Sequence, residues 1–122
     1  MIPVPAAKFP EDPLLISADP AIESAALLHH LLLALGADVA SEWKAGGVRY
    51  TRAGRLFCIV KPLAARVDLA FMKFGRARNK RILSAKGRMP FLPYLVEIEA
   101  PGDVDTEVRA WLRESYDMAG EG

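Results

Sequence analysis

Seven lysines and arginines lie within sixteen residues that contain no acidic side chain. They are Lys73, Arg76, Arg78, Lys80, Arg81, Lys86 and Arg88. Clustered cations of this kind bind phosphate groups, and arginine adds a planar fork of donors. Tyr50, Phe74 and Phe91 are aromatic residues nearby in the sequence that can stack on bases. The segment predicts a surface that contacts a polyanion, with Lys44, Arg49, Arg52 and Arg55 as further candidate contacts.

The distribution of charge supports a second interpretation of the same cations. Residues 44–88 carry thirteen lysines and arginines and one acid, whereas residues 1–43 and 89–122 are both acidic, for a net charge of +1 overall. The basic segment can therefore pair internally with the acidic flanks, above all with a helix expected near residues 103–117. Both interpretations predict a dipolar molecule wherever the basic segment reaches the surface.

An acidic group near the C-terminus offers a different chemistry. Glu97 and Glu99 share one face of a predicted strand, and Asp103, Asp105 and Glu107 follow directly. Oxygen-rich clusters bind hard cations, but these residues lack the spacing of a known metal loop. Asp103 and Asp105 also stand where a helix cap belongs, which accounts for them without a metal. We therefore assign no metal site and no cofactor.

Nucleophiles and histidines occur without the partners that catalysis needs. His29 and His30 are adjacent on a predicted helix and point about 100° apart, so they cannot grip one metal together. Cys58 lies in an apolar strand with no histidine nearby, and no serine has a nucleophile-elbow context. We expect a binding or adaptor domain rather than an enzyme.

Two helices are expected to flank the strands that position these residues. The first runs from about Pro20 to Leu35 after an extended, proline-containing arm of about residues 1–16. Its leucines at 27, 28, 31, 32 and 35 form one apolar face, and Ile22, Ala26, His29 and Leu33 lie opposite. Because both faces are apolar, we expect the second to be covered by the arm or by another subunit, which makes a homodimer one candidate assembly.

Alternating residues predict strands at 48–52, 56–60, 66–74 and 94–100, the first three joined by short turns as an antiparallel meander. The expected fold class is α+β, with an antiparallel sheet of about four to five strands and both helices packed on one face. The 122 residues fit a single domain, residues 1–122. One cysteine, no signal peptide and no long apolar run lead us to expect a cytoplasmic protein that does not enter the membrane.

The run of residues 42–50, which contains Trp43, Lys44, Gly46 and Tyr50, is followed by a glycine turn and residues 55–59. This run resembles the YdhG-like domains of unknown function, small bacterial α+β proteins, and residues 67–71 resemble their third strand. Residues 101–105 before a tryptophan-containing helix are similar to a related uncharacterised family. Gly47 and residues 85–89 depart from the family pattern. The resemblance implies the fold and, since some members are proposed to be frataxin-like, an iron or metal chaperone as an alternative function.

Three functions therefore remain open. The first is a binding domain whose 44–88 segment contacts nucleic acid or an acidic protein. The second is a self-associating domain that buries the far face of the first helix against its copy. The third is the metal chaperone that the resemblance implies, for which Glu97 and Glu99 are the candidate ligands.

Overall fold

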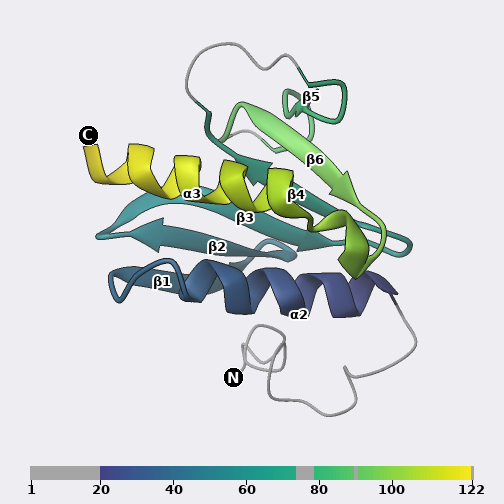
Figure 1. Ribbon diagram of the computed structural model, residues 1–122, viewed down its shortest axis with the longest axis horizontal. Coiled ribbons are helices and arrows are strands. Elements are labelled where there is room, and N and C mark those ends of the chain that lie inside the picture. The colour runs from purple at the N-terminus through teal and green to yellow at the C-terminus, as the bar shows by residue number, and fades with distance from the viewer. Residues whose placement is uncertain (1–19, 74–78, 90, 122) are drawn as a thin grey trace.

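The computed structural model describes residues 20–73, 79–89 and 91–121 and shows an α+β fold (Figure 1). The predicted arm of residues 1–16 lies outside these ranges. Helix α2 spans Pro20–Leu33 and helix α3 spans Thr106–Glu121. The strands are β1 (Val39–Lys44), β2 (Gly47–Arg52), β3 (Arg55–Pro62), β4 (Val67–Phe71), β5 (Leu83–Ser84) and β6 (Tyr94–Ile98), and a short 3-10 turn, η2, covers Pro101–Asp103.

The six strands form one antiparallel sheet in the order β1-β2-β3-β4-β6-β5. The predicted meander of β2, β3 and β4 is confirmed. Two tight turns, Ala45-Gly46 between β1 and β2 and Ala53-Gly54 between β2 and β3, have positive φ at both residues. That geometry gives a two-residue hairpin turn whose twist matches the strands, and glycine adopts it at no steric cost.

The strand count is higher than the four to five expected, because β1 and β5 were not predicted. β1 is an edge strand whose residues are mostly exposed, so it lacks the apolar alternation that marks a half-buried strand. β5 has two residues and exists only through its pairing with β6. Neither strand carries a pattern of its own in the sequence.

Both helices pack on one face of the sheet, with α3 over β2, β3 and β4 and α2 over β1, β3 and β4 (Figure 1). The main core fills this interface with inward residues of β2, β3, β4 and β6. Phe57 to Val60 are all buried, as expected for a strand covered on both faces. On the face of the sheet opposite the helices, this strand is covered by the loop between β5 and β6 rather than by another helix.

The buried side of α2 differs from the prediction. His29 lies on the inner face with Ala21, Ala25, Leu28 and Leu32, and its side chain is buried. Its Nδ1 lies 2.7 Å from the hydroxyl of Tyr50 on β2. The placement of His29 opposite the apolar face is therefore wrong: the polar ring is accepted in the core because it shares a hydrogen bond with Tyr50. Leu33, by contrast, is exposed.

Candidate functional site

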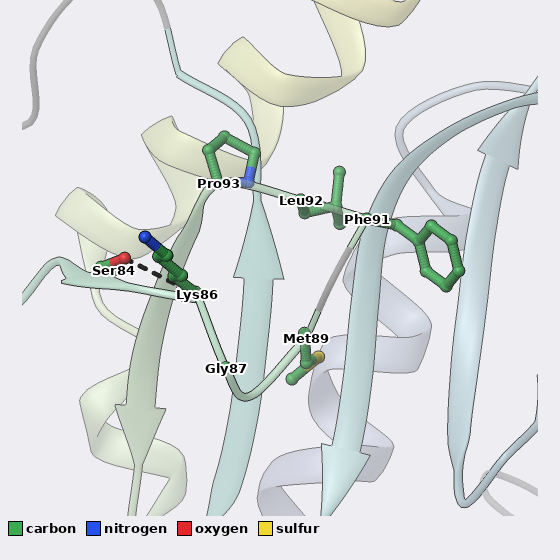
Figure 2. Close-up of a pocket in the computed structure, with 7 residues that line it drawn as sticks. All are labelled: Ser84, Lys86, Gly87, Met89, Phe91, Leu92 and Pro93. Atoms are coloured by element: carbon green, nitrogen blue, oxygen red, sulfur yellow. Dashed lines mark hydrogen bonds between the residues drawn. The ribbon is translucent and has the colours of Figure 1, made fainter.

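The loop between β5 and β6 folds back over the face of the sheet that the helices leave open. We call residues 84–89 and 91–93 the crossing segment. Figure 2 shows it running in front of the strands, with the helices behind them. Backbone bonds from Ala85 to Pro93 and from Met89 back to Ala85, at 3.0 and 2.8 Å, hold its shape.

A second, smaller core fixes the crossing segment to the sheet. Ala85, Met89 and Leu92 are buried against three outward residues of the strands, Ile59, Ala70 and Leu95. The register places Ile59, Ala70 and Leu95 opposite one another on β3, β4 and β6. The segment is therefore a packed cover whose position depends on the strand register.

Beside this core, two acids and two arginines form an ion network. Arg88 of the crossing segment donates to Asp68 on β4 at 2.9 Å and to Glu97 on β6 at 3.0 Å. Arg66 donates to the other oxygen of Asp68 at 2.9 Å and lies 3.5 Å from Glu97. The Asp68 side chain is only 6% exposed, so it needs these partners. Desolvation opposes the charge of Arg88, but its bonds to Asp68 and Glu97 outweigh that effect and raise its pKa.

A pocket of about 170 Å³ lies between the crossing segment and the first hairpin. Its described lining consists of Lys44, Ala45, Gly47, Arg49, Ile59, Lys61, Arg88, Met89 and Phe91. Four of these nine residues are cations and none is an acid. Ile59 and Met89, both buried, form the apolar part of this lining.

Three of the pocket cations make no ion pair within the described part of the chain. Lys44 lies at the end of β1, Arg49 on β2 and Lys61 on β3, and none of them has a carboxylate oxygen within 4.0 Å there. Glu42 stands opposite Arg49 in the β1–β2 register without reaching it. The guanidinium of Arg49 instead lies 4.7 Å from the centre of the Phe91 ring.

A wider hollow of about 640 Å³ adjoins the pocket on the crossing segment (Figure 2). It is lined by Ser84, Lys86, Gly87, Met89, Phe91, Leu92 and Pro93. Met89 and Phe91 line both spaces, so they form the boundary between them. Figure 2 shows the Phe91 ring reaching away from Ser84 and Lys86 over the neighbouring strands. This combined site can accept an anionic group on one side and an uncharged group on the other.

The predicted basic residues do not come together as one patch. Lys73 pairs with Glu114 of α3 at 3.2 Å. Arg81 bonds Asp105 and Glu107 at 2.9 and 3.1 Å and the carbonyl of Asp103 at 2.9 Å. These two cations belong to the helix-covered side of the molecule.

The remaining predicted cations are divided as well. Lys80 and Lys86 are exposed, and Arg88 lies in the ion network and the pocket. Of the further candidates, Arg52 pairs with Asp38 at 2.9 Å and Arg55 is exposed at the turn after β2. Arg76 and Arg78 lie outside the described residues, as does Phe74.

The residues on which the predicted resemblance rests take different positions. Tyr50 is fully buried, so its predicted role in stacking bases is wrong. Trp43 is partly buried against the main core, and Gly46 forms the first hairpin turn. Lys44 is the one member of the motif that lines the pocket.

The acidic candidates act as caps and ion-pair partners. Asp105 accepts a hydrogen bond from the Val108 backbone at 3.0 Å, which lowers the pKa of its carboxyl, with Arg81 acting in the same direction. Asp103 accepts from the backbone of Glu99 and Ala100. Across residues 20–73, 79–89 and 91–121, no three His, Cys, Asp or Glu side chains are arranged to hold a metal ion.

Sequence reasoning missed Lys61 and the meeting of Lys61 with Met89 and Phe91. Lys61 follows Ile59 at a spacing of two, so the strand pattern already placed both on one face. The crossing segment carried no such signal, because its glycine and proline residues indicated only a break.

The sequence matches no known family model, no curated protein and no solved structure. Among the described helices, neither α2 nor α3 is both long and apolar enough to cross a membrane.

Proposed function

We propose that this protein is a small binding domain that holds an anionic ligand in the pocket between the crossing segment and the first hairpin. The observation that carries the proposal is the convergence of Lys44, Arg49 and Lys61, without ion pairs among the described residues, on one partly apolar pocket. Each of these cations comes from a different strand, so the sheet itself sets their separation.

Like charges held close together destabilise a fold unless an opposite charge lies between them. The other described clusters of cations satisfy this condition internally, since Arg81 has Asp105 and Arg88 has Asp68. Lys44, Arg49 and Lys61 have no such ion pair among the described residues. An anion bound there removes their repulsion, so binding stabilises the folded state.

The geometry favours one compact anionic group over a long polyanion. A strand of nucleic acid needs a track of cations at successive phosphates. Lys73 and Arg81, which belonged to the predicted track, are paired with Glu114 and Glu107 of α3. Lys44, Arg49 and Lys61 line one pocket and so surround a point rather than a line.

The test is calorimetric titration of the protein with inorganic pyrophosphate at low and at high salt. We expect binding that weakens with salt, because exposed charges are screened. Lys61→Gln should weaken binding about tenfold or more, whereas Arg55→Gln removes an exposed cation away from the pocket and should leave it unchanged.

Equal affinities of the two variants would contradict the pocket assignment. A labelled single-stranded oligonucleotide, titrated in parallel by fluorescence anisotropy, tests the broader polyanion hypothesis. If the oligonucleotide binds tightly, its affinity is unchanged by Lys61→Gln and pyrophosphate does not bind, then a different surface binds polyanions.

A further inference from the structure

We infer that the ligand of this pocket is a nucleoside monophosphate, with its phosphate among Lys44, Arg49 and Lys61 and its base against Phe91. This inference rests on the proposed function and adds the chemistry of the uncharged part of the ligand. Two features carry it: the exposure and support of the Phe91 ring, and the wider hollow that continues the pocket beyond this ring.

Phe91 is the most exposed large apolar side chain of the described residues, at 60% of its full surface. Its ring is nevertheless fixed by the guanidinium of Arg49, 4.7 Å from its centre. A cation over an aromatic ring contributes attraction and holds the ring in one orientation. A supported ring with so much exposed surface is suited to stack on another planar group.

The two spaces differ in chemistry in the same way as the phosphate and the base of a nucleotide. The smaller one, about 170 Å³, carries Lys44, Arg49 and Lys61, which suit a phosphate, whereas its fourth cation, Arg88, is already paired with Asp68 and Glu97. The larger one, about 640 Å³, is lined by Leu92, Pro93, Met89 and the backbone turn at Gly87, with Ser84 and Lys86 as its polar side chains. A ligand that enters the first space with its charged end must pass Phe91 to occupy the second.

The polar side chains of the larger hollow favour a heteroaromatic ring over a hydrocarbon ring. The Ser84 hydroxyl oxygen accepts a bond from the Lys86 backbone at 3.2 Å, which leaves its hydrogen free to donate. The Lys86 side chain is exposed and adds a second donor. Ring nitrogens and carbonyl oxygens of a nucleobase accept such bonds.

A free nucleotide and the phosphorylated 5′ end of a strand share this chemistry. The decisive experiment is calorimetric titration of the full chain with adenosine 5′-monophosphate and with ribose 5-phosphate. Stacking of a base contributes about 1–3 kcal/mol, so we expect the nucleotide to bind about 5- to 150-fold more tightly than the sugar phosphate.

Variants at Phe91 test whether this ring is responsible. Phe91→Leu should remove most of the preference for the nucleotide and change the affinity for ribose 5-phosphate by less than about twofold. Phe91→Trp should retain the preference because its ring stacks as well. Leu63→Ala, which changes another exposed apolar side chain outside both spaces, is the control and should bind like the parent protein.

The outcomes separate this inference from the proposed function. Equal binding of the nucleotide and ribose 5-phosphate, both abolished by Lys61→Gln, would overturn the inference and leave the anion site standing. Failure of pyrophosphate, ribose 5-phosphate and the nucleotide alike would overturn both. Oligonucleotides with a 5′-phosphate or a 5′-hydroxyl identify the source: a preference for the phosphorylated end, lost in Phe91→Leu, supports recognition of a strand end.

Discussion

Asp38, Arg52 and Tyr116 join three parts of the chain through a few polar atoms. Arg52 of β2 donates to Asp38 at 2.9 Å and to the carbonyl of Tyr116 at 3.0 Å, and its guanidinium lies 3.9 Å from the Tyr116 ring centre. The Tyr116 hydroxyl donates to Asp38 at 2.7 Å. The hydrogen bond from Tyr116, followed by that from Arg52, lowers the pKa of the Asp38 carboxyl.

This lowered pKa makes stability depend on acidity. At pH values between the pKa of Asp38 in the folded state and its value of about 3.9 in an unfolded chain, the unfolded state binds more protons than the folded state. The contribution is therefore complete above pH 4 and is lost as the pH falls through the folded pKa. Asp105, whose pKa is also lowered, acts in the same range. We expect urea unfolding curves to show a falling midpoint below pH 4.

The matched variants are Asp38→Asn and Glu99→Gln, the second removing an exposed carboxylate that has no ion pair among the described residues. Asp38→Asn should be less stable at pH 7 and should lose less stability between pH 7 and pH 3 than the parent protein. If both variants follow the parent profile, Asp38 does not contribute to the acid dependence.

Helix α3 is hydrogen-bonded to the sheet at a β-bulge in β3. The β2–β3 register shifts between Tyr50 and Thr51, so Phe57 is an extra residue without a pairing partner on β2. The Ser115 hydroxyl donates to the Phe57 carbonyl at 2.6 Å and accepts from the Met72 backbone N–H at 2.9 Å. A single buried hydroxyl thus satisfies two backbone groups that the sheet leaves over.

Ser115→Ala should therefore lower the free energy of unfolding by about 1–3 kcal/mol, the cost of leaving buried polar groups without a bond. Chemical denaturation followed by circular dichroism measures this change. Ser41→Ala, at an exposed position of β1, is the control and should shift stability by less than about 0.5 kcal/mol. Similar values for the two variants would show that the bulge at Phe57 does not depend on Ser115.

The predictable elements are those with a pattern of their own. The alternation of Val67, Leu69 and Phe71 against Ala70 predicted a strand with two faces, and in the structure the first three lie in the main core while Ala70 lies in the smaller core, which was not predicted. Asp105 was recognisable as a cap because a helix begins directly after it. The α+β class and the packing of both helices on one face follow from such local signals.

The rest depends on contacts between distant residues. Lys44 and Lys61 lie seventeen positions apart and meet only because β1, β2 and β3 pair in one register. The burial of His29 depends on Tyr50, twenty-one residues away. Charge clustering along the sequence suggested one basic patch, but Lys73 and Arg81 pair with α3 whereas Arg88 pairs with Asp68 and Glu97 on the opposite face.

The whole molecule separates its charges by layer. Glu114 and Glu107 of α3 pair with Lys73 and Arg81 on the helix-covered side, whereas Lys44, Arg49 and Lys61 on the opposite face line the pocket without an ion pair among the described residues. The two interpretations of the basic segment thus apply to different parts of it. Internal pairing describes Lys73 and Arg81 on the helix-covered side and Arg66 and Arg88 on the open face, where the proposed anion site uses Lys44, Arg49 and Lys61.

Cys58 lies in the main core, so the reactivity of its thiol measures how often the folded protein opens. The thiol is fully buried in the main core, and burial raises its pKa well above the usual range. A thiol reagent reaches it only through unfolding, so we expect the labelling rate in native buffer to follow the free energy of unfolding. Ser115→Ala should accelerate labelling in proportion to its loss of stability, and fast labelling insensitive to that variant would contradict this burial.

The strand order has a consequence for how the chain reaches its fold. Each of β1 to β4 lies next to its neighbour in the sequence, so hairpins can close in succession at a small entropic cost. The main core, however, requires Val108, Trp111 and Leu112 from α3, the last element of the sequence given. We therefore expect the part of the core that α3 covers to stay open until α3 has been synthesised, although α2 precedes the strands in the sequence.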